Sequence, residues 1–350
     1  MKAPFVYFGG KRRVAPVVWS ALGNVDNYVE PFAGSLAVLL ERPHPPRTET
    51  VNDADGMLAN FWRALAQAPE EVARWADWPV NEIDLMARHL WLVNEGKSRL
   101  VAGMEADPDF YDAKIAGWWV WGLNSWIGSG WCSGDGPWMS DKDGGLSKRP
   151  HLGDAGRGVN RKRPHLGNAG RGVNRKLPHL GNAGRGLYLY FEQLAARLRG
   201  VRVCCGDWSR VVTNGALSYG SAVGIFLDPP YLGSVRTGDL YASDDHHVAN
   251  DVRDWCLANG ENRRYRIVLA GYSEEHDALM PSSWRRYRYS ASAAYSTTAA
   301  AERNAHGNGA GNLLNRHNEC LWFSPGCLNA QPGLFSALAE EPALFAETPG

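Results

Sequence analysis

The sequence predicts an α/β fold in which helices cover both faces of a mostly parallel β-sheet. Short apolar runs such as "VRVCC" (201–205) and "YRIVLAGYS" (265–273) alternate with longer segments of helical periodicity. A chain of 350 residues with 44% hydrophobic content can bury a sizeable core. Strands that alternate with helices favour a parallel sheet, and such sheets bind ligands at the carboxyl ends of their strands.

The first elements predict a βαβ unit. A helix is expected over "VAPVVWSAL" (14–22), with Pro16 near its start and Gly23 at its end. "NYVEPF" (27–32) predicts a short strand, and "AGSLAVLLER" (33–42) a turn of small residues that opens into a helix. "TETVND" (48–53) predicts a second strand that ends in polar residues.

Residues 54–127 predict a helical insertion or subdomain. Apolar residues recur at helical spacing in "DGMLANFWRALA" (55–66), "NEIDLMARHLWLV" (81–93) and "DFYDAKIAGWWVWGLNSW" (109–126). The chain has 15 tryptophans, several of them in this region. Packing in a helical core is the favoured use of these rings, with base stacking as the alternative.

A repeat of 14 residues follows at 149–186. Copies of "RPHLGNAGRGVNRK" recur with Pro150, Pro164 and Pro178 in phase, and aliphatic residues are sparse, which favours a surface loop over packed repeats. Residues 148–186 carry ten cations against the single acid Asp154: Lys148, Arg149, Arg157, Arg161, Lys162, Arg163, Arg171, Arg175, Lys176 and Arg185. Two interpretations stay open, contact with phosphates and a duplication tolerated in a loop. The phased histidines His151, His165 and His179 lack carboxylate or thiol companions, which disfavours a metal site.

The second half of the chain predicts the remaining sheet. The expected elements are a helix at 187–200, strands at 201–205 and 221–228, a helix around 248–260, strands at 265–273 and 284–290, and a closing strand at 319–324. A flexible tail is expected from Pro325 to residue 350.

The stretch "IFLDPPYLG" (225–233) is the strongest functional candidate. Two prolines after Asp228 remove two N–H donors and prevent the strand from continuing. Asp228 and the neighbouring carbonyl of Pro229 present two acceptors, which match the two hydrogens of an exocyclic amine, and Tyr231 offers a face for stacking. The alternative is a tight turn with a capping Asp.

The ends of two earlier predicted strands indicate a ligand-binding site near the 225–233 stretch. Gly34, between small residues, allows a ligand to approach the backbone, and the helix start expected behind it would offer free N–H groups. Asp53 suits hydrogen bonds to ribose hydroxyls. Tight packing for the glycine and a helix cap for Asp53 are the structural alternatives.

Six motifs in order resemble the D12-class, Dam-like DNA adenine-N6 methyltransferases. They are FGGK (8–11), VEPFAGS (29–35), ND (52–53), GDW (206–208), DPPY (228–231) and VLAGYS (268–273). The resemblance covers most of residues 4–324, without the repeat. It implies a Rossmann-like, S-adenosylmethionine-dependent methyltransferase sheet formed by residues 1–53 and 187–324, with a target-recognition region inserted at 54–186.

The resemblance also implies roles for individual residues. Asp228, Pro229, Pro230 and Tyr231 would be the catalytic residues, acting on an adenine flipped out of double-stranded DNA. The implied cofactor residues are Tyr7, Gly10, Lys11, Phe32, Gly34, Ser35, Asp53, Asp207 and Asp228, with Lys11 on the methionine carboxylate, Asp53 on the ribose and Asp207 near the adenine. Asp207 is also a candidate helix N-cap. The candidate DNA contacts are Asn124, Arg157, Arg171 and Arg185.

Alternative functions share the same motifs. The two acceptors could hold the N4 amine of cytosine or a base of RNA, and an inactive DNA-binding relative would keep the fold. A cognate restriction enzyme is a conceivable partner.

The composition bounds the remaining expectations. The sequence shows neither the pattern of a signal peptide nor a run of about 18 apolar residues. We therefore expect a cytoplasmic protein without a membrane partner. The six cysteines form no CxxC pair, so no zinc site, no other metal and no disulfide framework is expected. The net charge of zero gives no overall sign of a nucleic-acid partner, which leaves local patches to decide.

Overall fold

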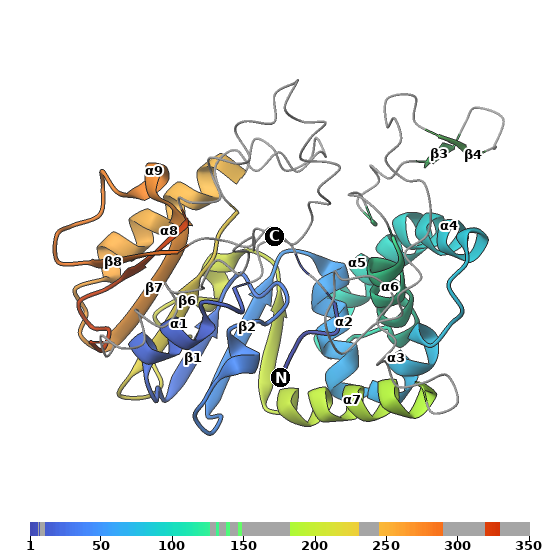
Figure 1. The fold of residues 1–350 in the computed structure, drawn as a ribbon, viewed down its shortest axis with the longest axis horizontal. Coiled ribbons are helices and arrows are strands. Elements are labelled where there is room, and N and C mark those ends of the chain that lie inside the picture. The colour runs from blue at the N-terminus through green and yellow to red at the C-terminus, as the bar shows by residue number, and fades with distance from the viewer. Residues whose placement is uncertain are drawn as a thin grey trace, which may run out of the picture.

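The computed structural model describes residues 1–5, 7, 11–126, 131–132, 138–140, 146–148, 183–230, 245–289 and 319–329. These residues form a seven-stranded sheet of order β5-β2-β1-β6-β7-β9-β8 and a separate two-stranded sheet, β3-β4 (Figure 1). Residues 149–182 of the repeat region and the tail beyond residue 329 lie outside the described residues, and the last repeat residues, 183–186, begin α7.

Five neighbouring strands of the large sheet run parallel. They are β5 (Val201–Cys205), β2 (Thr48–Asp53), β1 (Asn27–Glu30), β6 (Val223–Leu227) and β7 (Tyr265–Tyr272). Next to β7, β9 (Glu319–Phe323) runs antiparallel and pairs in turn with β8 (Arg285–Tyr289). The expected α/β architecture with a mostly parallel sheet is confirmed. The small sheet pairs β3 (Trp138–Ser140) with β4 (Leu146–Lys148), which the sequence pattern did not predict.

A group of helices lies between β2 and β5 in the chain. It consists of α2 (Gly56–Gln67), α3 (Pro69–Ala76), α4 (Glu82–Trp91), a π-helical turn (Leu92–Gly96), α5 (Lys97–Ala106), α6 (Ala113–Ser125) and α7 (Ala183–Leu198). Side chains set three of the starts: Asp55, Asn81 and Asp112 each accept a hydrogen bond from a backbone N–H in the first turn of α2, α4 and α6. In Figure 1 these helices stand beside the sheet. Their role as a target-recognition region stays a prediction.

The strands bury both faces, because successive side chains point to opposite sides. On one face Phe226, Val268 and Ala270 join a core that includes α1 (Ala15–Leu22) and the helices between β2 and β5. On the other, Ile225 and Leu269 pack with α8 (Asp245–Asn259) and the 3₁₀ helix η3 (Trp208–Val211). The short helix α9 (Ser273–His276) follows β7.

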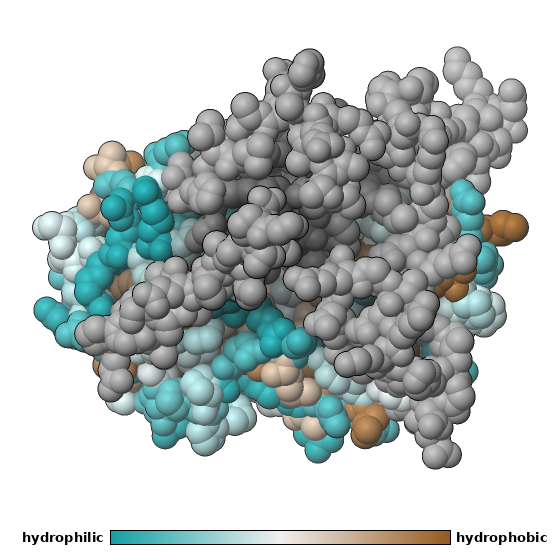
Figure 2. Space-filling view, in the orientation of Figure 1, coloured by the Kyte–Doolittle hydropathy of each residue, from teal (hydrophilic) through white to brown (hydrophobic). Residues whose placement is uncertain are grey.

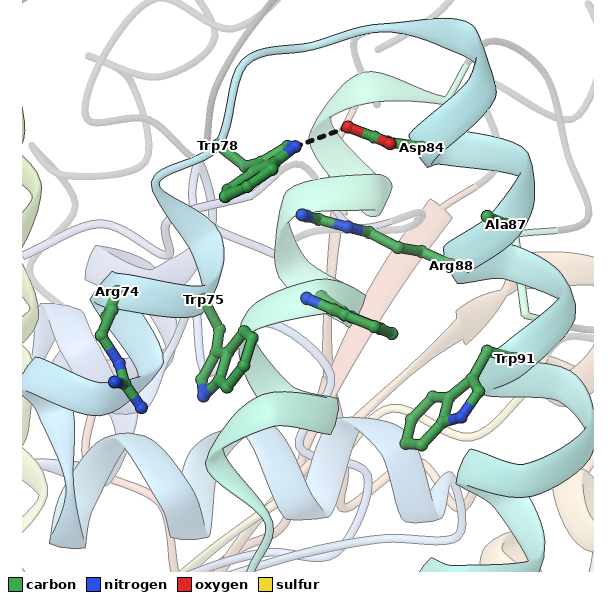
Figure 3. A pocket seen from close by; sticks show the side chains of 8 residues that line it. Arg74, Trp75, Trp78, Asp84, Ala87, Arg88 and Trp91 are labelled. Atoms are coloured by element: carbon green, nitrogen blue, oxygen red, sulfur yellow. Dashed lines mark hydrogen bonds between the residues drawn. The ribbon is translucent and has the colours of Figure 1, made fainter.

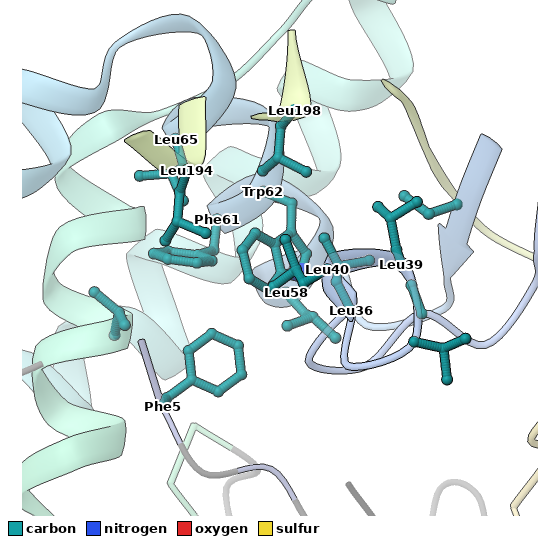
Figure 4. Close-up of a cluster of buried hydrophobic side chains, with 14 of the residues drawn as sticks. Phe5, Leu36, Leu39, Leu40, Leu58, Phe61, Trp62, Leu65, Leu194 and Leu198 are labelled. Atoms are coloured by element: carbon teal, nitrogen blue, oxygen red, sulfur yellow. The ribbon is translucent and has the colours of Figure 1, made fainter. Parts of the chain in front are cut away.

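The first core continues from the sheet into the helical group. Phe5 lies 5.5 Å from Phe61, 5.6 Å from Trp62 and 5.3 Å from Trp119, measured between ring centroids. Figure 4 shows Phe5 near Phe61 and Trp62, with Leu194 of α7 behind them. The N-terminal segment therefore helps to join the helices to the sheet.

The helix expected over 33–42 is wrong. Only a 3₁₀ turn, η1 (Leu39–Glu41), forms there, and Gly34 and Leu36 have positive φ angles of 47° and 55°. The N–H of Ala33 donates to the carbonyl of Asn52 at 2.8 Å, so a donor of this segment is used by β2 and not by a helix. The first crossover is thus a strand–turn–strand unit, and no α-helix begins behind Gly34.

On the face shown in Figure 2, hydrophilic side chains cover much of the described surface and hydrophobic ones appear at scattered points. The most exposed large apolar side chains include Ile83 and Tyr219, at 82% and 62% exposure. Among the described helices, none combines the length and the apolar character needed to cross a bilayer.

Candidate active site at the strand ends

The strand order of the sheet reverses between β1 and β6. From β1 the chain continues to β2 and β5 on one side, and from β6 it continues to β7 on the other. Parallel sheets bind ligands outside the carboxyl ends of the strands at such a point. The residues that follow β1 and β6, from Pro31 and Asp228 onward, therefore flank the expected position of a ligand.

Asn52 holds three strand ends together. Its amide nitrogen donates to the carbonyl of Pro31 after β1 at 3.1 Å and to that of Gly206 after β5 at 2.9 Å. The N–H of Gly206 donates to the carbonyl of Asp53 at 3.1 Å. Asn52 is 2% exposed, so these bonds are shielded from water. The sequence had indicated the ND motif, but it gave Asn52 no role.

Gly34 forms a turn that Tyr7, Asp53 and Trp62 surround. Its N–H donates to Oδ2 of Asp53 at 2.9 Å, and its carbonyl accepts from Nε1 of Trp62 at 3.0 Å. A Cβ added at Gly34 would lie 3.2 Å from the ring of Tyr7. Three predicted cofactor residues are therefore in contact, and the predicted Ser35 is buried directly after them.

Asp53 bonds to backbone N–H groups with both carboxylate oxygens. Oδ2 accepts from Gly34, and Oδ1 accepts from the N–H of Asp55 at 3.0 Å. Asp55, not Asp53, caps α2, so the cap alternative for Asp53 is wrong. A carboxylate has about four acceptor positions, so these two bonds are compatible with further contacts of Asp53.

Lys11 and Asp228 form an ion pair. Nζ of Lys11 lies 3.1 Å from Oδ2 of Asp228, and their side chains are 5% and 19% exposed. Lys11 precedes α1, and its carbonyl accepts from the N–H of Ala15 at 3.0 Å. Pro229 and Pro230 follow Asp228 directly, with Pro229 buried. The structure thus brings the first motif of the chain onto the predicted catalytic carboxylate.

Glu30 is a buried carboxyl near Asp228, and no role was predicted for Glu30 from the sequence. It is 2% exposed and accepts a hydrogen bond from the hydroxyl of Tyr28 at 2.9 Å. Burial raises the pKa of Glu30 to about 8; the Tyr28 bond opposes the shift and the charge of Asp228 adds to it. Its position at the end of a buried strand, in VEPFAGS, was the available signal.

An aromatic group lies beside the turn. Phe32 stacks with Trp208 at 6.1 Å between ring centroids, and Trp208 meets the edge of Trp255 at 6.5 Å. Asp207 caps η3 by accepting from the N–H of Ser209 at 2.9 Å. The N-cap alternative for Asp207 is confirmed, and the hydroxyl of Ser209 also donates to Oδ1 of Asp207.

Comparison with known families agrees with these motifs. Residues 7–77 match the family model of the D12 class N6 adenine-specific DNA methyltransferases. The match contains Tyr7, Lys11, the Gly34 turn and Asp53, and confirms the resemblance to this family over that range. The match covers 71 of the 350 residues, and the activity named by this family is adenine-N6 methylation of DNA. A search of curated proteins found no match.

The remaining predicted residues are not brought to this site or lie outside the described part. Asn124 donates from its amide to the carbonyls of Pro4 at 3.2 Å and Val120 at 2.8 Å, so it ties α6 to the N-terminal segment. Gly10, Tyr231, Arg157 and Arg171 lie outside the described residues, and Arg185 is placed in the first turn of α7 by its backbone alone. Within the described ranges no three His, Cys, Asp or Glu side chains group as metal ligands.

Proposed function

We propose that the protein transfers a methyl group from S-adenosylmethionine to N6 of adenine in double-stranded DNA. The observation that carries this proposal is the position of Asp228, at the end of β6 and paired with Lys11, beside the turn of the family match. A cytoplasmic location, the recognition role of residues 54–186 and a cognate restriction enzyme as partner belong to the same proposal.

The residues around Gly34 fit this cofactor. Gly34, with a φ of 47° and no Cβ, lets the ring of Tyr7 lie close to the turn, and Asp53 is a carboxylate that could accept from a ribose hydroxyl. We assign Phe32 and Asp207 to the adenine end and Lys11 to the carboxylate end of the cofactor. When bound, the cofactor supplies an electrophilic methyl group.

Asp228 and the carbonyl of Pro229 act on the amine. The two prolines fix the backbone, so the carboxylate and the carbonyl can accept one N6–H each from a flipped adenine on which Tyr231 stacks. Accepting these bonds draws the nitrogen lone pair out of ring conjugation and toward the methyl group. Lys11 contacts Oδ2, and a carboxylate has enough acceptor positions for the ammonium and the amine together.

The ion pair suggests the order of events at the site. A ligand carboxylate near Lys11 would compete with Asp228 for the ammonium, so cofactor binding would loosen the 3.1 Å contact. Asp228 would then gain freedom to turn toward the amine. Positioning and electrostatics supply the rate enhancement in this mechanism.

The test is a methylation assay with product identification. The full chain is incubated with S-adenosylmethionine labelled in the methyl group and unmethylated genomic DNA, and the nucleosides are analysed by mass spectrometry. We expect label in N6-methyldeoxyadenosine. Label only on cytosine N4, label only in added RNA, or no transfer at all would each contradict the proposal, and the last would favour a DNA-binding relative without turnover.

A further inference from the structure

A cavity lies in the helical group, on residues to which the proposed function assigns no individual role. Its volume is about 520 Å³, within the usual range of ligand pockets. We call it the tryptophan pocket. It is lined by Arg74, Trp75, Trp78, Asp84, Ala87, Arg88, Trp91 and Trp118. Figure 3 shows Trp75, Trp78 and Trp91 around the side chain of Arg88, which extends from α4.

Close helix packing builds the walls. A Cβ at Gly117 of α6 would lie 2.3 Å from Cβ of Trp75, so only glycine lets α3 and α6 approach this closely. The rings of Trp75 and Trp91 both meet Trp118 edge to face, at 6.0 and 5.2 Å between centroids. The indoles are therefore held in fixed orientations.

Arg88 is the central polar group of the pocket. It is 7% exposed, and its guanidinium carbon lies 4.2 Å from the ring centroid of Trp121, 5.0 Å from Trp118 and 5.1 Å from Trp78. Its Nη1 is buried and has no hydrogen-bond partner among the described residues. A buried donor without a partner costs free energy that a ligand acceptor would recover.

The pocket offers donors rather than free acceptors. Nε1 of Trp118 is a second buried donor without a partner in the described part of the chain. Oδ2 of Asp84 already accepts from Nε1 of Trp78 and from the amide of Asn81, each at 2.6 Å. A ligand that brings acceptors would satisfy the two unpartnered donors.

The charge around the pocket is mainly positive. Arg74 and Arg88 line it, and Nζ of Lys114 lies 4.5 Å from the ring of Trp91 and 4.4 Å from that of Trp118. Among the described residues that line the pocket, Asp84 is the only carboxylate, and Glu70 and Glu71 lie with Arg74 at a neighbouring hollow. Flat apolar walls, unpartnered donors and cations together suit a flat ligand that carries acceptors and neighbouring negative charge.

We propose that the tryptophan pocket binds one unpaired nucleobase of a nucleic acid, with guanine preferred. Bases stack on aromatic side chains, and O6 and N7 of guanine are the acceptors that an arginine binds in pairs. Arg88 and Trp118 would donate to the base edge, and Arg74 and Lys114 would meet the adjoining phosphates. The proposal rests on the proposed function only for the class of ligand, because base binding here requires no methyl transfer.

The test measures binding of a single base at constant phosphate charge. The probes are 11-residue oligodeoxynucleotides of abasic sites in which only the central position carries guanine, 7-deazaguanine or no base. Binding to the full chain is followed by fluorescence anisotropy without methyl donor. We expect the guanine probe to bind about tenfold more tightly than the abasic one, as stacking on aromatic side chains allows. We expect 7-deazaguanine, which lacks the N7 acceptor, to fall between them.

Three variants localise the effect. Arg88→Met removes the guanidinium but keeps the stem, and Trp78→Ala removes a wall that is 46% exposed. Both should reduce the guanine preference to less than threefold. Lys97→Met, which removes an exposed cation of α5, should keep it.

Several results would overturn the proposal. Equal binding of the guanine and abasic probes to the unaltered chain would show that no base is bound. A preference that survives in both pocket variants would place the base elsewhere. Binding of decaproline that is lost in Trp78→Ala, without any base preference, would assign the pocket to a peptide. Since no probe carries adenine and no cofactor is present, these results are distinguishable from failure of the methylation assay.

Discussion

Lys11 and Asp228 are more than 200 positions apart in the chain, yet they form an ion pair. The sequence interpretation gave them separate roles, a cofactor contact and an amine acceptor. Because the two side chains are in contact, a change at one of them is expected to affect the role of the other. It makes Asp228 the residue at which the proposed chemistry is most directly tested.

The variant Asp228→Asn should lower methyl transfer by at least about a hundredfold, because the amide presents one acceptor oxygen and no charge to the amine. Transfer is measured with labelled methyl donor at saturating DNA. Asp251→Asn, on the exposed side of α8, is the matched control and should retain full activity. Circular dichroism confirms that both variants fold, and undiminished transfer by Asp228→Asn would refute the assigned role.

Glu30 should make stability depend on pH. Its pKa is raised from 4.5 to about 8 in the folded protein, so between these values the folded chain keeps a proton that the unfolded chain has lost. The free energy of unfolding therefore decreases by about 1.4 kcal/mol per pH unit across this window, from full stability below pH 4.5.

Glu30→Gln should remove this loss, because glutamine stays neutral and can still accept from Tyr28. Urea unfolding at pH 5 and pH 8 measures the difference, and the gain of the variant over the parent should reach several kcal/mol at pH 8. Glu105→Gln, an exposed change on α5, should keep the slope of the parent. Equal slopes for the parent and Glu30→Gln would show that Glu30 ionises normally.

At the scale of elements, the Gly34 turn replaces the expected helix as the link between β1 and the proposed cofactor site. Gly34→Ala should weaken binding of S-adenosylmethionine about tenfold and destabilise the fold by about 1 kcal/mol, because alanine is strained at this φ and its Cβ would press on Tyr7. Calorimetric titration and thermal unfolding measure the two effects.

Gly56→Ala supplies the control for this change. It lies in the first turn of α2, where a Cβ meets no atom within 4 Å. Its binding and stability should equal or exceed those of the parent, since alanine favours a helix. If Gly34→Ala behaved in the same way, the turn would tolerate a side chain and would not define the cofactor site.

A buried charge network joins α7 to β2. Glu49 accepts from Arg197 at 2.6 and 2.9 Å and from Arg42 at 3.1 Å, and its side chain is 1% exposed. Glu49→Gln should reduce the free energy of unfolding by about 3 to 5 kcal/mol, because it leaves two guanidinium groups without their carboxylate.

The exposed pair of Arg12 and Glu41, also 3.1 Å apart, is the matched comparison. Glu41→Gln should cost no more than about 1 kcal/mol, because water screens an exposed pair. Chemical denaturation of both variants measures the contrast. Similar losses would mean that burial does not set the strength of these pairs.

At the scale of the molecule, one sheet places the proposed catalytic and cofactor residues at its centre and carries the helical group at one edge. Strand pairing explains the first arrangement: β1 lies between β2 and β6, so the ends that carry Glu30, Asp53 and Asp228 are neighbours. The core shared by the sheet and the helices explains the second. DNA bound by the helical group would therefore lie beside the strand ends.

The repeats belong to this scale, although residues 149–182 lie outside the described residues. Deletion of 149–176 removes two copies with eight cations and should reduce the slope of log affinity against log salt concentration by at least about two, if the loop contacts phosphates. The slope is measured with a fixed duplex from 50 to 300 mM salt. A second variant with glutamine at the eight basic positions keeps the loop length; an unchanged slope in both would support a tolerated duplication.

Local patterns in the sequence determined most elements and the chemistry of the strand ends. Period-2 and helical spacing located the strands of the large sheet and most of the helices, and the Asp-Pro-Pro order predicted a rigid pair of acceptors. These features depend on neighbours in the chain, so the sequence alone reveals them. The helix expected over 33–42 was wrong because the N–H groups of Ala33 and Gly34 bond to β2, a contact that no local pattern encodes.

Only the tertiary structure decided which distant residues meet. The pairing of Lys11 with Asp228, the burial that raises the pKa of Glu30, and the bonds from Asn52 to two other strand ends all depend on strand order. The tryptophans were predicted to pack, and they do, but three helices had to converge before their rings enclosed a cavity around Arg88. The spacing of residues in the sequence determines on which face of a helix or strand a side chain lies. Burial, ion pairing and cavities arise only when elements that are far apart in the chain pack together.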